Sequence, residues 1–180
     1  MGFIDIHCHI LPGIDDGPAD IKESREMARV ALNDGISHIF ATPHFINGLY
    51  KHSGRDIITL VDNLKGSISD SIEIFYGSDA GITLDLPKRI ENGDVLTLNG
   101  SQYLFIELPA YTVPPNVDNL IFNLKKKGIQ PIITHPERNM GLINNLCLMG
   151  RLKEDGAMYQ LTAMSITGGF GREAKMSCLR

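Results

Sequence analysis

The sequence opens on residues 4–17, where two histidines separated by one residue follow a short apolar run and lead into a turn rich in Gly, Pro and Asp. Because side chains alternate across a strand, we expect His7 and His9 to project to one face and Cys8 to the other. Two imidazoles on one face can bind one metal ion. An isolated His-x-His pair more often supplies one core and one surface histidine. Whether this pair indicates a metal site therefore depends on the rest of the chain.

Potential metal ligands also end four later apolar segments. They are His44, Asp79, Glu107 and His135. In a closed barrel of parallel strands, the carboxyl ends of all strands gather at the mouth that holds the active site. Taken singly, Asp79 or Glu107 is equally consistent with a helix cap or a surface acid, but the recurrence at strand ends favours a metal site. His38 and His52 lack this placement and are interpreted as ordinary histidines.

The elements that must position these residues alternate between strands and helices. A first strand is predicted in the apolar run that begins at Ile4 and leads into the two histidines, and later strands are predicted at 37–44, 72–76, 103–109, 130–134 and 158–162. Helices are predicted at 20–35, 56–65 and 117–128, with a further helix between the motif at 135–139 and the sixth strand, a weaker helix around Pro87 and a helix beginning in 168–180. A short extra strand is predicted at 94–98, before an Asn-Gly turn. The nearly continuous apolar strands are typical of parallel βαβ units, and so of an α/β fold.

Composition predicts one globular domain that covers residues 1–180. The chain is 43% apolar, and its net charge of −4 gives no overall basic field for nucleic acid. No apolar stretch reaches the ~20 residues of a membrane helix, so no membrane insertion is expected. Three widely spaced cysteines argue against a disulfide framework and favour a cytoplasmic protein. The basic run at 125–127 is interpreted as a helix C-terminus.

Several catalytic routes are excluded by missing patterns. A nucleophilic-cysteine phosphatase needs an arginine six positions after the cysteine, but Ile14 follows Cys8 and Lys153 follows Cys147 at that distance. No Gly-x-Ser-x-Gly elbow, Walker loop or dinucleotide fingerprint is present. The histidines and carboxylates instead suit Mn²⁺, Fe²⁺ or Zn²⁺. Such ions lower the pKa of bound water towards ~7 and can generate a hydroxide that attacks phosphorus.

Five motifs carry a resemblance to a known family. They are Ile-Asp-Ile-His-Cys-His-Ile-Leu-Pro at 4–12, Asp-Asp-Gly-Pro at 15–18, Ala-Thr-Pro-His at 41–44, Phe-Ile-Glu-Leu-Pro at 105–109 and His-Pro-Glu-Arg-Asn at 135–139. With them the chain resembles the bacterial manganese-dependent protein-tyrosine phosphatases of the polymerase and histidinol phosphatase (PHP) superfamily. These enzymes accompany capsule or exopolysaccharide synthesis. The match spans nearly the whole chain.

The resemblance implies a distorted TIM-like (β/α)7 barrel with three manganese ions. It assigns the first ion to His7, His9 and Asp79, the second to Asp79, Glu107 and His135, and part of the third to Asp16 and His44. Arg138 would bind the substrate phosphate. The implied partner is a phosphotyrosine protein, namely a bacterial tyrosine kinase of polysaccharide synthesis, and a homo-oligomer is compatible with the pattern.

Two departures from the family pattern bear on these expectations. Members of the family usually carry glutamate at the position of Asp79, and aspartate reaches roughly 1.5 Å less far. A Ser-Asp-Ala-His motif on a seventh strand is missing, so we expect a barrel truncated after about six strands and a domain incomplete at its C-terminus. Barrels of this kind usually have about 200 residues or more.

Two alternative functions stay open at this point. One is another metal-dependent phosphoesterase of the same superfamily, acting on histidinol phosphate or a nucleotide. The other is an inactive, truncated remnant that acts as a binding protein. A comparison of the hydrolysis of a phosphotyrosine peptide with that of small phosphate esters distinguishes the tyrosine phosphatase from the first alternative. Absence of turnover with the phosphotyrosine peptide would favour the second alternative.

Overall fold

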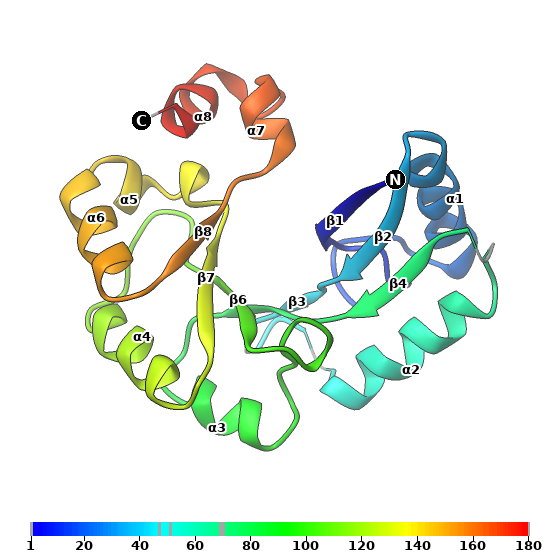
Figure 1. Cartoon of the computed structure of the whole chain (residues 1–180), viewed down its shortest axis with the longest axis horizontal. Coiled ribbons are helices and arrows are strands. Elements are labelled where there is room, and N and C mark those ends of the chain that lie inside the picture. Colours follow the sequence, from blue (N-terminus) through cyan, green and yellow to red (C-terminus); the bar gives the residue numbers. More distant parts are fainter. Residues whose placement is uncertain (1, 47, 51, 69–70, 180) are drawn as a thin grey trace. The chain divides into compact units, whose positions relative to one another are not determined.

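A computed structural model describes residues 2–46, 48–50, 52–68 and 71–179. Strands and helices follow one another along the chain, and four strand pairs among the described residues are parallel (Figure 1). The predicted α/β class with parallel strands is therefore confirmed. The chain forms two compact units: unit 1 comprises Met1–Ala80 and Asp85–Leu104, and unit 2 comprises Gly81–Leu84 and Phe105–Arg180. No helix among the described residues is long and apolar enough to span a bilayer.

Unit 1 is built on a three-stranded parallel sheet in the order β1-β2-β4. Its strands are β1 (Phe3–Cys8), β2 (Ile36–Ala41) and β4 (Glu73–Tyr76), and its two long helices are α1 (Ile21–Asn33) and α2 (Gly54–Lys65). Asp20 caps α1 as predicted, because its carboxylate accepts hydrogen bonds from two backbone N–H groups of the first turn. Ser53 and Asp56 form a capping box that begins α2 two residues before the predicted start.

The core of unit 1 lies between this sheet and the two helices. Its buried aliphatic side chains include Ile39 and Ile74 from the strands and Ile57, Val61 and Leu64 from α2. The spacing of the α2 residues at i, i+4 and i+7 is the helical period that the sequence shows. This packing fixes the sheet whose first strand carries His7 and leads directly into His9.

The second predicted strand breaks before His44, whereas the third ends at Tyr76 as predicted. The strand expected to run to His44 ends at Ala41, and His44 opens a separate strand, β3 (His44–Phe45). Pro43 lacks a backbone N–H and cannot continue the ladder, but its carbonyl accepts a hydrogen bond from the N–H of Asp79 at 3.0 Å. Asp79 likewise opens β5 (Asp79–Gly81), which pairs with β3 in parallel.

Between β5 and the next strand, one of the two predicted elements is present and the other is absent from the described residues. The weak helix with Pro87 is present as α3 (Leu86–Glu91), with the proline in its first turn. The extra strand at 94–98 is absent from this described segment, which runs into a 3₁₀ turn, η1 (Leu98–Gly100). Asn99 and Gly100 both adopt positive φ, as the predicted turn requires, but the N–H of Leu96 donates to the Ser78 hydroxyl and not to a neighbouring strand.

Unit 2 contains three adjacent strands in the order β6-β7-β8. These are β6 (Tyr103–Glu107, in unit 2 from Phe105), β7 (Gln130–Thr134) and β8 (Met158–Gln160), and β7 and β8 are parallel. The helices are α4 (Val117–Lys126), η2 (Pro136–Arg138), α5 (Met140–Ile143), α6 (Leu146–Glu154), α7 (Ala163–Thr167) and α8 (Gly171–Cys178). Lys125 and Lys126 lie in the last turn of α4, as predicted from the basic run.

The C-terminal helix differs in its bounds from the prediction. Gly168, expected to belong to its beginning, has φ 95° and ends α7, because the left-handed conformation stops an α-helix. The last helix, α8, begins three residues later, and Arg180 lies outside the described residues. Phe170 occupies the turn between the two helices.

Candidate metal centre and phosphate-binding turn

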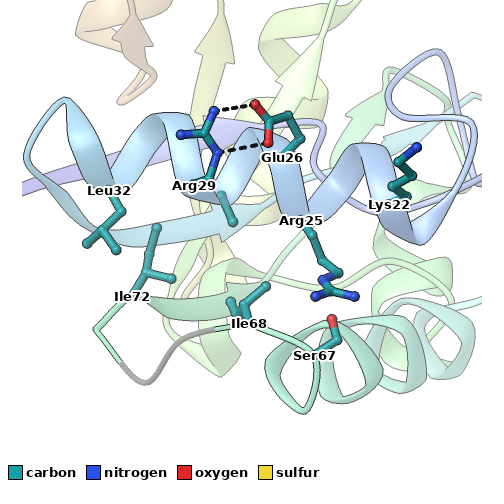
Figure 2. A pocket seen from close by; sticks show the side chains of 9 residues that line it. Lys22, Arg25, Glu26, Arg29, Leu32, Ser67, Ile68 and Ile72 are labelled. Carbon is teal, nitrogen blue, oxygen red and sulfur yellow. Dashed lines mark hydrogen bonds and ion pairs between the residues drawn. The ribbon is translucent and has the colours of Figure 1, made fainter.

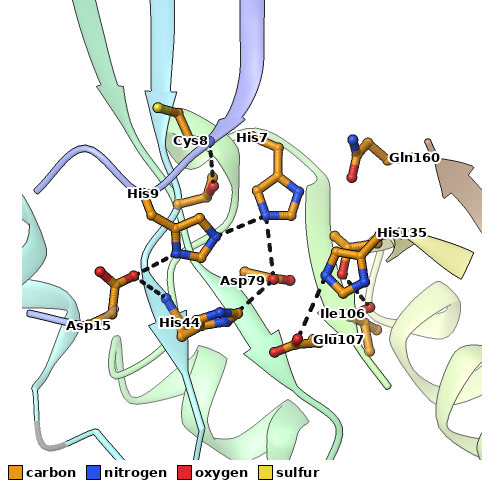
Figure 3. Close-up of polar contacts among 12 residues, drawn as sticks. His7, Cys8, His9, Asp15, His44, Asp79, Ile106, Glu107, His135 and Gln160 are labelled. Carbon is orange, nitrogen blue, oxygen red and sulfur yellow. Dashed lines mark hydrogen bonds and ion pairs between the residues drawn. The ribbon is translucent and has the colours of Figure 1, made fainter. Parts of the chain in front are cut away.

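His7 and His9 face each other at the end of β1. Their Nε2 atoms are 3.3 Å apart, and both rings are partly buried (Figure 3). Cys8 packs against the apolar core of unit 1, so the alternation expected from the sequence is present. Burial, aided by the carboxylates of Asp5 and Asp15, raises the pKa of the Cys8 thiol to about 12. A thiol of this kind stays protonated and makes a poor nucleophile.

Asp79 lies beside the two histidines and is fully buried. Its Oδ2 atom is 3.4 Å from Nε2 of His7 and 3.6 Å from Nδ1 of His44. The parallel register of β3 and β5 pairs His44 directly with Asp79, so the break at Pro43 brings the two side chains together. A buried carboxylate among imidazoles is costly unless a cation balances its charge.

Asp15 holds the histidines from outside the predicted ligand set. Its carboxylate is 2.7 Å from Nδ1 of His9 and accepts hydrogen bonds from the N–H groups of Gly17 and His44. Burial opposes ionisation, yet these hydrogen bonds together lower the pKa of Asp15 below its ordinary value. With Nδ1 of His9 donating to this carboxylate, Nε2 of His9 presents its lone pair towards His7.

The pair Asp15-Asp16 was visible in the sequence, but only Asp16 was expected to contribute. The two acids differ in their surroundings, because the side chain of Asp15 is enclosed and that of Asp16 is exposed. Asp16 Oδ1 lies 3.6 Å from Nδ1 of His9 and 3.6 Å from Nε2 of His44. His52, interpreted as ordinary, also touches the site, since its Nε2 donates to the backbone carbonyl of His44 at 2.7 Å.

Gly17 closes the turn that carries the two acids. A Cβ atom on this residue would lie 2.4 Å from the carbonyl oxygen of His9, which is closer than side-chain atoms approach a backbone oxygen. The glycine therefore permits the turn to pack directly against the segment that bears His9. This contact brings Asp15 within reach of His9.

The donor set of unit 1 fits a transition-metal ion. Ligand atoms bound 2.0–2.2 Å from one ion lie roughly 3.0–3.5 Å from each other. The separations of 3.3 Å between the two Nε2 atoms and 3.4 Å from His7 to Asp79 fall in this range. Two groups with ligand atoms within 4.8 Å of one another occur in unit 1: His7, His9 and Asp79, and His9, Asp16 and His44. We assign His9 to the first group because Asp15 engages its Nδ1 atom.

Unit 2 carries its predicted residues at two adjacent strand ends. Glu107 ends β6 and His135 follows β7, with Nε2 of His135 3.6 Å from Oε1 of Glu107. The Thr134 hydroxyl donates to the carbonyl of Ile106 at 3.3 Å and links the same two strand ends. His135 adopts positive φ, which is uncommon for a residue with a side chain, and so turns the chain sharply into η2.

The three residues Glu137, Arg138 and Asn139 each make different contacts. Glu137 is buried, and its Oε1 atom accepts hydrogen bonds from the N–H and the hydroxyl of Thr162. Asn139 is also buried, and its amide donates to the carbonyls of Pro109 and Thr112. Arg138 is the exposed member, and its guanidinium carbon lies 4.4 Å from the centre of the Phe170 ring. Sequence reasoning assigned a role to Arg138 alone, although Glu137 and Asn139 stood in the same motif.

The predicted site residues thus gather in two sets, one in each unit. Unit 1 brings together His7, His9, Asp16, His44 and Asp79. Unit 2 brings together Glu107 and His135, with Arg138 three residues further along the chain.

A separate cavity of about 420 Å³ in unit 1 has a different chemistry. It lies between α1 and the segment after α2 and is lined by apolar side chains such as Ile68 and Ile72 and by cations (Figure 2). Its acid, Glu26, forms an ion pair with Arg29, and no histidine is present among the described lining residues. This cavity therefore offers no set of metal ligands.

Comparison with known proteins places this arrangement in context. The sequence profile described as capsular polysaccharide synthesis, CpsB/CapC, matches residues 3–180. The tyrosine-protein phosphatase YwqE of Bacillus subtilis is 40% identical over 98% of this chain and 71% of its own length. The putative tyrosine-protein phosphatase CapC of Staphylococcus aureus is 33% identical over the same shares.

A solved structure has a fold similar to that of this chain. It comes from the crystal structures of YwqE from Bacillus subtilis and CpsB from Streptococcus pneumoniae, described as unique metal-dependent tyrosine phosphatases. The match has a TM-score of 0.92 and 38% identity, and covers 98% of this chain and 73% of that chain.

Proposed function

This chain belongs to the capsular polysaccharide synthesis CpsB/CapC family, and we propose that it is a metal-dependent protein-tyrosine phosphatase. The observation that carries the proposal is the convergence of His7, His9 and Asp79 in unit 1, with ligand atoms spaced as one ion requires. Relatives with tyrosine phosphatase activity in their names, and a metal-dependent solved structure, support the same reaction.

The proposed ligands follow the two sets of residues. His7, His9 and Asp79 bind one ion, and Asp16 and His44 contribute to another. Glu107 and His135 contribute to a further ion from unit 2. Mixed imidazole and carboxylate ligands suit Mn²⁺, with Fe²⁺ and Zn²⁺ as chemically acceptable substitutes. When bound, the ions supply activation of a water nucleophile and neutralisation of phosphoryl charge.

The protein residues provide orientation and charge for this reaction. Asp15 holds the ring of His9 and fixes which nitrogen carries the proton. Arg138 presents a planar, permanently charged group that matches two oxygens of a phosphate. The leaving group is a tyrosine phenol with a pKa of about 10, so it departs without strong assistance from a general acid.

The finer features of the family complete the proposal. We propose that the parallel strands are part of a distorted PHP barrel of the (β/α)7 kind. The substrate is a phosphotyrosine protein, for which a bacterial tyrosine kinase of polysaccharide synthesis is the candidate. A cytoplasmic location, expected from the three widely spaced cysteines, fits such a substrate.

The test is phosphate release from a phosphotyrosine peptide by the purified chain, with added Mn²⁺ and with a chelator. We expect release with Mn²⁺ and its loss with the chelator. Histidinol phosphate and a nucleotide monophosphate are the comparison substrates, and a preference for either would contradict the tyrosine assignment. The Asp79→Asn variant should lose turnover, whereas Asp62→Asn on the exposed side of α2 should retain it.

A further inference from the structure

The guanidinium of Arg138 is positioned by an aromatic ring. Its central carbon lies 4.4 Å from the centre of the Phe170 ring, well within the distance at which a cation is attracted to an aromatic face. Within the described part of unit 2, Arg138 forms no ion pair with a carboxylate. The aromatic face is therefore the contact that restricts this long side chain.

The backbone on both sides of Arg138 is independently fixed. On one side, Glu137 Oε1 accepts hydrogen bonds from Thr162 at 3.1 Å and 3.0 Å. On the other side, Asn139 donates to Pro109 and accepts a hydrogen bond from the N–H of Leu142. The two neighbours point inwards and are buried, so the turn presents Arg138 outwards.

The same contacts place Phe170. Thr162 caps α7, and its hydroxyl lies 2.8 Å from the hydroxyl of the buried Ser165. The chain then turns through Gly168 and Gly171, which both have positive φ, and Phe170 lies between them with 46% of its surface exposed. Glu137 thus ties the turn that bears Arg138 to the helix that leads to Phe170.

An aromatic partner suits a phosphate-binding arginine better than a carboxylate does. A carboxylate would neutralise the guanidinium and occupy the N–H groups that a phosphate needs. An aromatic ring carries no charge that would neutralise the guanidinium, and it does not occupy the N–H groups as a carboxylate does. The geometry therefore orients the arginine while keeping its charge and its donors for the substrate.

We infer that Phe170 is a positioning residue for substrate binding, which holds the Arg138 guanidinium ready for the phosphate of phosphotyrosine. The inference rests on the proposed function, because it requires Arg138 to bind the substrate phosphate. Phe170 itself need not touch the reacting atoms. It acts by reducing the number of conformations that Arg138 must give up on binding.

The first experiment measures the contact itself by NMR in the full chain. We expect the side-chain protons of Arg138 to be shifted upfield by the ring current of Phe170. The shift should disappear in Phe170→Leu and persist in Phe170→Tyr. An arginine without this shift in the unsubstituted protein would overturn the inference, whatever the chain catalyses.

The second experiment measures binding of a peptide that carries a non-hydrolysable phosphonate in place of the tyrosine phosphate. We expect Phe170→Leu to weaken binding about three- to tenfold, the range of one cation–π contact, and Phe170→Tyr to restore it within about twofold. In turnover, KM should rise and kcat should change little. Arg138→Gln should weaken binding more strongly than Phe170→Leu.

Phe122→Leu is the matched control. Phe122 is also an exposed phenylalanine of unit 2 beneath a cation, since Nζ of Lys126 lies 5.7 Å from its ring centre. Equal effects of Phe170→Leu and Phe122→Leu on binding would overturn the inference alone. Unchanged binding in Arg138→Gln would overturn both the inference and the proposed role of Arg138, while phosphotyrosine hydrolysis would still test the proposed activity.

Discussion

The two sets of candidate site residues are held in different ways. In unit 1, His7 contacts both His9 and Asp79 directly, and the three side chains are largely enclosed. In unit 2, the backbone around Arg138 is anchored by buried neighbours, and the functional side chain itself stays exposed on an aromatic ring. In unit 1 the functional side chains hold one another in place. In unit 2 the buried neighbours and the aromatic ring hold an exposed functional side chain in place.

This difference corresponds to the chemistry proposed for each region. Metal ligands must converge on one point, so their mutual distances matter and the loss of one leaves the others without their geometry. A phosphate-binding cation must instead meet a ligand that comes from solvent, and so needs an accessible side chain with few alternative conformations. We therefore expect substitutions of the metal ligands in unit 1 to cause abrupt losses, and substitutions in the contacts that support Arg138 in unit 2 to cause graded ones.

The largest expected effect comes from Asp79→Asn in unit 1. The amide keeps the shape of the side chain but removes the charge and one ligand oxygen, so Mn²⁺ affinity should fall by about 100-fold or more. Calorimetric titration of the metal-free protein with Mn²⁺ measures the affinity. Asp62→Asn serves as the control, and comparable affinities in the two variants would contradict the central place of Asp79.

Asp15→Asn tests whether the outer carboxylate supports the ligands. Because Asp15 orients His9 and binds the N–H of His44, its loss should weaken Mn²⁺ binding by about 10- to 100-fold. The same titration applies, again against Asp62→Asn. An unchanged affinity would show that the ligands hold their positions without Asp15, and would remove the contrast between the two regions.

In unit 2, Thr162→Val removes the side-chain hydrogen bond that joins α7 to Glu137 of η2. It removes the α7 cap and the hydroxyl donor to the buried Glu137, so the free energy of unfolding should fall by about 1–2 kcal/mol. Urea denaturation measures the change. Thr167→Val, on an exposed side of the same helix, is the control and should cost less than about 0.5 kcal/mol.

Tyr159 gives the smallest expected effect, and one that depends on pH. Its hydroxyl donates to the carbonyl of Met149 at 2.6 Å, and burial raises its pKa to about 12 from an unfolded value of about 10. The neutral phenol is favoured by the fold, so its contribution is complete below pH 10 and is lost as the pH rises towards 12.

Tyr159→Phe should therefore lower the free energy of unfolding by about 1 kcal/mol at pH 7. The difference between the two proteins should shrink between pH 10 and pH 12. Denaturation at several pH values measures it, with the exposed Tyr111→Phe as a control that should change little at pH 7. A difference that stays constant to pH 12 would contradict the raised pKa.

Much of the local structure was determined by the sequence itself. Asp20 and the apolar spacing of α2 act over a few residues, and such signals depend only on backbone geometry and solvent. The alternation of side chains along a strand likewise determined that His7 and His9 share a face. The types of the candidate ligands, histidine and carboxylate, already limited the chemistry to metals that accept nitrogen and oxygen donors.

Contacts between distant segments were decided only by the tertiary structure. The sequence predicted one strand to His44, whereas pairing with Asp79 makes that residue the start of a new strand. It assigned no role to Asp15, because the contacts of this carboxylate with His9 and His44 arise only in the folded chain. Nor could it join Phe170 to Arg138 across 32 positions. Such pairs form because packing brings remote segments together, and no local period or propensity encodes that proximity.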